Sequence, residues 1–114
     1  MTQSYLAMMM DSLDKKIVLL EKIEAENAVQ RGILEKSGAV DMEAFDATVE
    51  TKGDLIEELE RLNDGFEALF AQVRDEVNEN RVRYKAEIAA MQEKIRAITA
   101  LSGSIQAEEK RNKA

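Results

Sequence analysis

Apolar side chains recur at alternating steps of three and four residues from residue 45 to residue 105. This spacing keeps one apolar stripe on one side of an α-helix, whereas a half-buried strand would alternate with a period of two. The chain contains no proline, the residue that most strongly interrupts helices. The pattern therefore predicts an all-α fold. The stripe comprises Phe45, Val49, Ile56, Leu59, Phe66, Phe70, Val73, Val77, Tyr84, Ile88, Met91, Ile95, Ile98 and Ile105.

A first helix is expected over residues 3–36, where a second stripe of apolar residues follows the same spacing. Two polar residues, Asn27 and Gln30, stand within this stripe. An asparagine in a packed helical seam fixes the register of the helices at a cost in stability. Alternatively, the stripe drifts onto Val29 and Ile33 and leaves Asn27 at its edge. We favour this second interpretation.

The segment Ser37–Asp41 carries several signals for a turn. Gly38 suits the left-handed conformation that often follows the end of a helix. Asp41 is a good N-cap for a second helix, and Val40 with Phe45 has the spacing of a hydrophobic staple. These signals agree, so a helix boundary is predicted here.

A second turn is expected at Asn63–Gly65, because Asn, Asp and Gly favour turns and Asp64 with Glu67 has capping-box spacing. The apolar stripe nevertheless crosses this point without a change of phase. An unbroken helix over 42–108 would contain 67 residues and extend for about 100 Å. The first helix would cover only half of that length, so an unbroken helix would require a partner chain.

These boundaries predict a single helical domain over residues 1–114, an antiparallel three-helix bundle of up-down-up topology with coiled-coil-like packing and a long C-terminal helix. The second helix is expected over residues 42–62 and the third over 65–108, followed by a disordered tail at 109–114. In this arrangement the stretch 88–105 of the third helix would project beyond the other two helices by about 27 Å.

An apolar stripe without intramolecular cover is typical of a binding surface. The projecting residues are therefore predicted to bind an amphipathic helix of a partner, and a second copy of the chain is the alternative cover. Changing Ile98 and Leu101 to aspartate is expected to abolish binding and leave thermal stability almost unchanged. The predicted partner-binding residues are Ile88, Met91, Ile95, Ile98, Leu101 and Ile105.

The composition excludes much catalytic chemistry, because the chain has no histidine and no cysteine. Acidic pairs at helical spacing, such as Glu57 with Glu60, are expected to lie on solvated helix faces. A di-iron bundle would also need histidine ligands. We therefore predict a protein that is not an enzyme and that has no catalytic residue, cofactor or metal site.

The net charge is −7, and it is concentrated in one segment. Residues 41–65 contain nine acidic and two basic residues. This balance argues against nucleic-acid binding, which needs a basic face. No stretch resembles a signal peptide or reaches the roughly 20 apolar residues of a membrane span, so a cytoplasmic protein without membrane insertion is expected.

Several strings in the chain resemble the FlgN-type flagellar export chaperones: Ser12–Ile17, Phe45–Asp46, Lys52, Leu59–Phe66 and Ile105–Glu108. The resemblance implies an antiparallel helical bundle with a long C-terminal helix. Members of this family hold hook–filament junction proteins before export and deliver them to the export gate of the flagellar type III secretion apparatus.

In that family the substrate-binding role lies on the C-terminal amphipathic helix, which corresponds as a region to the stripe at Ile95, Ile98, Leu101 and Ile105. A FliT-type chaperone with filament-cap substrates is the nearest alternative. The competing class is a structural coiled-coil or scaffold subunit that acts through homo-oligomerisation. The oligomeric state of the purified chain distinguishes these classes.

Overall fold

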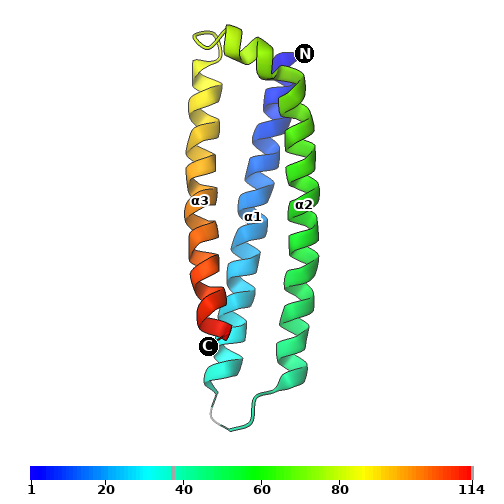
Figure 1. The fold of residues 1–114 in the computed structure, drawn as a ribbon, viewed down its shortest axis with the longest axis vertical. Coiled ribbons are helices and arrows are strands. Elements are labelled where there is room, and N and C mark those ends of the chain that lie inside the picture. Colours follow the sequence, from blue (N-terminus) through cyan, green and yellow to red (C-terminus); the bar gives the residue numbers. More distant parts are fainter. Residues whose placement is uncertain (37, 114) are drawn as a thin grey trace.

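The computed structural model describes residues 1–36 and 38–113, and over these residues it contains three helices and no strand. The helices are α1 (Thr2–Glu35), α2 (Met42–Glu79) and α3 (Lys85–Lys113). Successive helices run in opposite directions in an elongated bundle of 61 × 20 × 16 Å (Figure 1). The predicted all-α three-helix bundle is confirmed.

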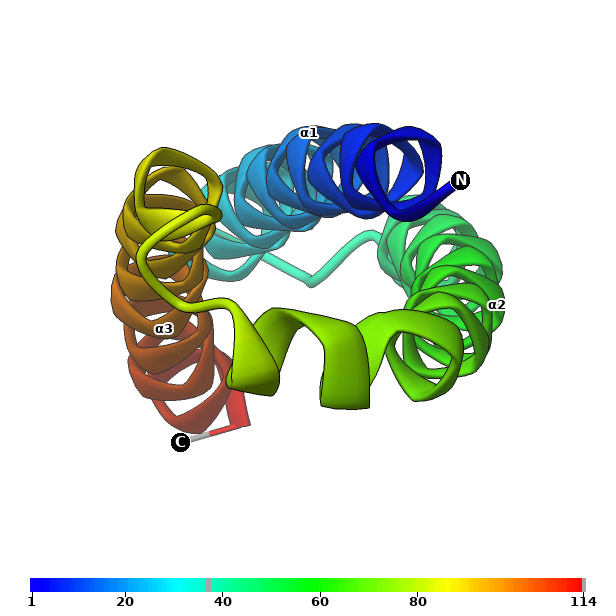
Figure 2. The ribbon, with the colours of Figure 1, turned by 90° about the horizontal axis from the view of Figure 1, so that it is seen from above.

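The helix against which both others pack is α1. Viewed from above, α2 and α3 lie on either side of it (Figure 2). The backbone of α1 comes within 8 Å of both neighbours, Cα to Cα, whereas no described Cα atom of α2 lies that close to α3. The bundle therefore has two packed seams, and its third side, between α2 and α3, has no direct backbone packing.

The core consists of two apolar clusters along these seams. The upper core cluster lies at the end that carries the N-terminus and consists of Leu6, Met9, Val73 and Tyr84. The lower core cluster consists of Leu13, Leu20, Ile23 and Ile98. Both clusters combine residues of α1 with residues from a helix or turn distant in sequence.

The first predicted turn is confirmed in its main features. Gly38 has a φ of +101°, a conformation that favours glycine because it has no Cβ atom. The Asp41 carboxylate accepts a hydrogen bond from the Ala44 amide at 3.1 Å and so caps α2. Ser37 lies outside the described residues, and the staple of Val40 with Phe45 stays a prediction.

The predicted turn at Asn63–Gly65 is wrong, because α2 continues through it as far as Glu79. The apolar residues on either side, Leu62 and Phe66, stay in phase, so packing against α1 holds this stretch helical. A glycine inside a helix costs only about 1 kcal/mol. A continuous apolar face therefore outweighs a local turn signal.

The second turn lies instead between Asn80 and Tyr84. Asn80 leaves the helical conformation, with φ −128° and ψ 43°, and its amide donates to the Val77 carbonyl at 3.2 Å. Its side-chain Nδ2 donates to the Glu76 carbonyl at 2.8 Å and thereby replaces a backbone bond of the helix.

The second turn comes later than predicted, and the predicted start and end of the third helix are also wrong. The third helix begins at Lys85 rather than residue 65, and it continues to Lys113. Residues 109–113 are therefore helical and not a disordered tail, while Ala114 lies outside the described residues. Asn112 Nδ2 donates to the Asn27 carbonyl at 3.1 Å and anchors this end of α3 on α1.

Candidate partner-binding groove

The open side of the bundle forms a groove between α2 and α3, with α1 as its floor. Two hollows lie along it, one of about 740 Å³ and one of about 270 Å³. We call them together the α2–α3 groove. Its apolar lining comprises Leu13 of α1, Phe45, Val49, Ile56, Leu62 and Phe66 of α2, and Ile95, Ile98 and Ile105 of α3.

Several large apolar side chains of the groove are half exposed. The exposed fraction is 49% for Val49, 45% for Ile56 and 45% for Ile95. Phe70, at 44%, lines a further hollow that shares Phe66 with the groove. Val49 and Ile56 belong to α2 and Ile95 to α3, so an occupant between the two helices would cover all three.

The groove has one open end and one partly closed end. The last turns of α2 lean across towards α3 at the end of the bundle that carries the N-terminus (Figures 1 and 2). Val73, in this part of α2, is buried in the upper core cluster. A helix bound in the groove would therefore lie below this crossing, beside residues 45–67 of α2.

The predicted overhang of residues 88–105 is wrong. Because the second turn lies at Asn80–Tyr84, α3 starts at the same end of the bundle as α1. It then runs parallel to α1 and packs along it. The ion pair of Lys94 with Asp14, at 2.5 Å, and the hydrogen bond of Asn27 to Glu108, at 3.2 Å, join the two helices along their length.

Five of the six predicted partner-binding residues consequently pack in the core. Ile98, only 8% exposed, belongs to the lower core cluster, and Leu101 and Ile105 pack against that cluster. Ile88 and Met91 pack against the upper core cluster. Ile95 alone among the six is largely exposed.

A polar cluster lies at the lower end of the groove. Lys52 Nζ donates to Gln30 Oε1 at 3.2 Å and pairs with Glu109 Oε1 at 2.5 Å. Asn112 Nδ2 also donates to Gln30 Oε1, at 3.2 Å. These contacts join α1, α2 and α3 where their backbones are not all packed together. From the sequence, Lys52 was named only among the residues of the family resemblance, although its position within the apolar stripe of α2 indicated a buried contact.

The drift interpretation of Asn27 is also wrong. Asn27 is 1% exposed and lies in the seam, whereas Val29 is 51% exposed. Its Nδ2 has a partner, but its Oδ1 is buried without a hydrogen bond among the described residues. A buried, partly satisfied amide costs stability and favours one register, because shifted registers would leave it with fewer partners.

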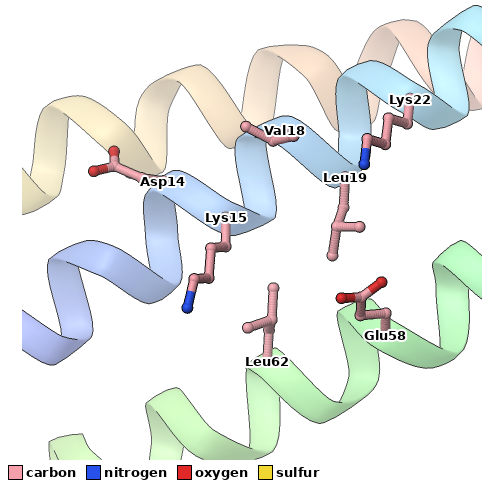
Figure 3. A pocket seen from close by; sticks show the side chains of 7 residues that line it. All are labelled: Asp14, Lys15, Val18, Leu19, Lys22, Glu58 and Leu62. Atoms are coloured by element: carbon pink, nitrogen blue, oxygen red, sulfur yellow. The ribbon is translucent and has the colours of Figure 1, made fainter.

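Another hollow, of about 350 Å³, lies between α1 and α2 (Figure 3). Leu19 and Leu62 point towards each other across it, and the charged Lys15 and Glu58 flank them. Leu19 is only 5% exposed. This hollow is thus a shallow gap above two helices that pack on each other. In the α2–α3 groove, by contrast, the two flanking helices do not pack on each other.

The described residues contain no group of three or more acidic side chains arranged to hold a metal ion. None of the described helices combines the length and apolar character needed to cross a lipid bilayer. The exposed acids of residues 41–65 include Asp46, Glu50 and Glu57. Comparisons with protein-family models, curated proteins and solved structures found no match for this chain.

Proposed function

We propose that this chain is a non-enzymatic helix-binding protein and that its α2–α3 groove receives one amphipathic helix of a partner. The single observation that supports the proposal is the missing seam: α2 and α3 both present half-exposed apolar side chains, yet their backbones stay apart. A fourth helix in this position would complete a four-helix bundle, a stable arrangement for apolar helix faces.

The energetic argument follows from the exposed fractions of Val49, Ile56 and Ile95. Burial of apolar surface stabilises a complex by about 25 cal/mol per Å² removed from water. The groove is also largely preformed, because core packing already holds both of its walls. A preformed groove reduces the ordering cost of binding.

The resemblance to FlgN-type chaperones supplies a biological setting for this activity. In this proposal the chain holds a hook–filament junction protein in the cytoplasm and delivers it to the flagellar type III export gate. The binding surface differs from that expected from the sequence: Ile95 of α3 acts together with Val49 and Ile56 of α2, while Ile98 and Leu101 support the core.

The direct test is a calorimetric titration of the purified chain with the terminal helix of a hook–filament junction protein from the same organism. A saturable one-to-one complex is expected. The variant Ile56→Asp with Ile95→Asp should lose it, because each aspartate would place an unpaired charge in an apolar interface.

The matched control is Val18→Asp with Val29→Asp. These valines are exposed to a similar extent, 49% and 51%, but lie on α1 away from the groove. Val18 also lines the hollow of Figure 3, so the control tests that hollow as well. Binding lost in the control and kept in the groove variant would overturn the assignment of the groove.

A homo-oligomeric scaffold is the second candidate, because the exposed side chains of the groove would also be buried against a second copy. Sedimentation velocity of the parent chain and of the Ile56→Asp, Ile95→Asp variant tests it. A stable parent dimer that becomes monomeric in the variant would favour the scaffold. A parent that is monomeric at micromolar concentration favours the helix-binding function.

A further inference from the structure

The two rims of the α2–α3 groove differ in charge. A row of acidic residues begins next to Ile56 and follows the outer edge of α2 in steps of three and four. All four are exposed: Glu57, Glu60, Asp64 and Glu67. The row at the same offsets from Ile95 on α3 consists of Arg96, Thr99, Gly103 and Gln106, and its one charged residue, Arg96, pairs with Glu93.

The acidic row forms no ion pair within the described part of the chain. This holds although Arg61 lies one helical turn from both Glu57 and Asp64. Lys16, which reaches α2 from α1, donates to Asn63 Oδ1 at 2.8 Å rather than to an acid. Lys52 is already paired with Glu109.

We infer that the helix bound in the α2–α3 groove carries lysine or arginine along the edge that faces α2. This inference rests on the proposed function. The acids at 57, 60, 64 and 67 extend along three turns of α2. Basic residues at the same steps of three and four on the occupant would face them over that length.

A second copy of the chain does not supply this chemistry. If two grooves face each other with α2 against α2, the two acidic rows oppose one another. If α2 lies against α3 of the other copy, the acids meet a row with one basic residue, Arg96, which already pairs with Glu93. Neither arrangement gives each of the four carboxylates a basic partner, whereas a helix with a basic edge does. Charge complementarity of this kind sets the specificity of an interface.

The test uses two synthetic amphipathic helices of about 20 residues, long enough to span the groove. Both carry the same leucine and alanine stripe, and one edge of the stripe carries lysine in the first helix and glutamate in the second. Fluorescence anisotropy measures the dissociation constant of each helix with the full chain. At low salt, the lysine-edged helix is expected to bind at least about tenfold more tightly than the glutamate-edged helix. The difference should be smaller at high salt.

The variant Glu60→Gln, Asp64→Asn, Glu67→Gln removes three charges from the rim with little change in shape. It should bring the affinities of the two helices within about threefold of each other. The matched control Glu21→Gln, Asp54→Asn, Glu58→Gln removes three exposed acids that lie away from the groove. This control should keep the preference for the lysine-edged helix.

The outcomes separate the two proposals. Equal affinities of the parent chain for both helices would overturn the charge inference and leave helix binding intact. A control variant that loses the preference as fully as the rim variant would also overturn it, because net charge alone would then explain the effect. If neither helix binds, the proposed function itself fails. A parent dimer that excludes both helices would identify the occupant as a second copy.

Discussion

The packed seams of α1 and the open α2–α3 groove are built from the same kinds of side chain. Ile98 and Ile95 lie three residues apart on one helix, yet their exposed fractions are 8% and 45%. The difference arises from which neighbour each meets: Ile98 meets α1 in the lower core cluster, while Ile95 faces the gap to α2. The comparison teaches that two positions three residues apart on one apolar stripe differ in burial: one contributes to the core, and the other stays open for the proposed occupant.

The largest effect is expected from a variant that disrupts the packing of α3 on α1. Ile98→Asp with Leu101→Asp should lower the free energy of unfolding by more than about 4 kcal/mol, because the buried charge at position 98 has no partner. This expectation reverses the one drawn from the sequence, in which these residues projected from the bundle. Urea unfolding followed by far-UV circular dichroism measures the loss. A variant as stable as the parent would show that α3 does not pack on α1.

The next effect concerns the upper core cluster. Leu6→Ala should cost about 2–5 kcal/mol, since Leu6 is 2% exposed and its loss leaves a cavity between α1 and the end of α2. The control is Met8→Ala, a neighbouring residue that is 54% exposed and should change the stability little. Similar midpoints of thermal unfolding for the two variants would contradict the assignment of this cluster as core.

A smaller effect is expected at the polar end of the groove. Lys52→Ala removes the contacts to Gln30 and Glu109 and should lower the stability by about 1–2 kcal/mol, because the Glu109 carboxylate is partly exposed and recovers water. Lys15→Ala breaks the exposed pair with Asp11 and should have almost no effect. Equal losses of stability in the two variants would show that the polar cluster adds nothing.

The fourth prediction tests the continuity of α2 beside the groove. Gly65→Ala should stabilise the chain by about 0.5–1 kcal/mol, because residue 65 is helical and an added Cβ meets no atom within 4 Å. Gly38→Ala is the counterpart and should destabilise it, because Gly38 has a positive φ. Destabilisation by Gly65→Ala would contradict a continuous helix and support the turn predicted from the sequence at Asn63–Gly65.

The smallest effect on stability is expected in the groove itself. Ile56→Asp with Ile95→Asp should change the free energy of unfolding by less than about 1 kcal/mol, since both side chains are half exposed and an aspartate there stays hydrated. The same variant should lose partner binding. A large loss of stability would mean that the groove side contributes to the core and that the comparison drawn above fails.

Much of the fold followed from local chemistry that the sequence displays. The steps of three and four require helices, because only a helix keeps such residues on one side. The first turn was readable from Gly38 and Asp41, whose conformational and capping preferences act within a few residues. The solvated acidic face of α2 was also predictable, since its residues lie off the apolar stripe.

Tertiary structure decided the remaining features, because they depend on energies summed over distant residues. The stretch at Asn63–Gly65 is helical since α1 packs along its apolar face, and this packing outweighs the preferences of three residues. The position of the turn also determines the candidate site. Because the turn lies at Asn80–Tyr84, Ile98 packs in the core and Ile95 lines the groove. Spacing along one chain places a residue on a stripe, but only the positions of the neighbouring helices decide which part of that stripe stays open.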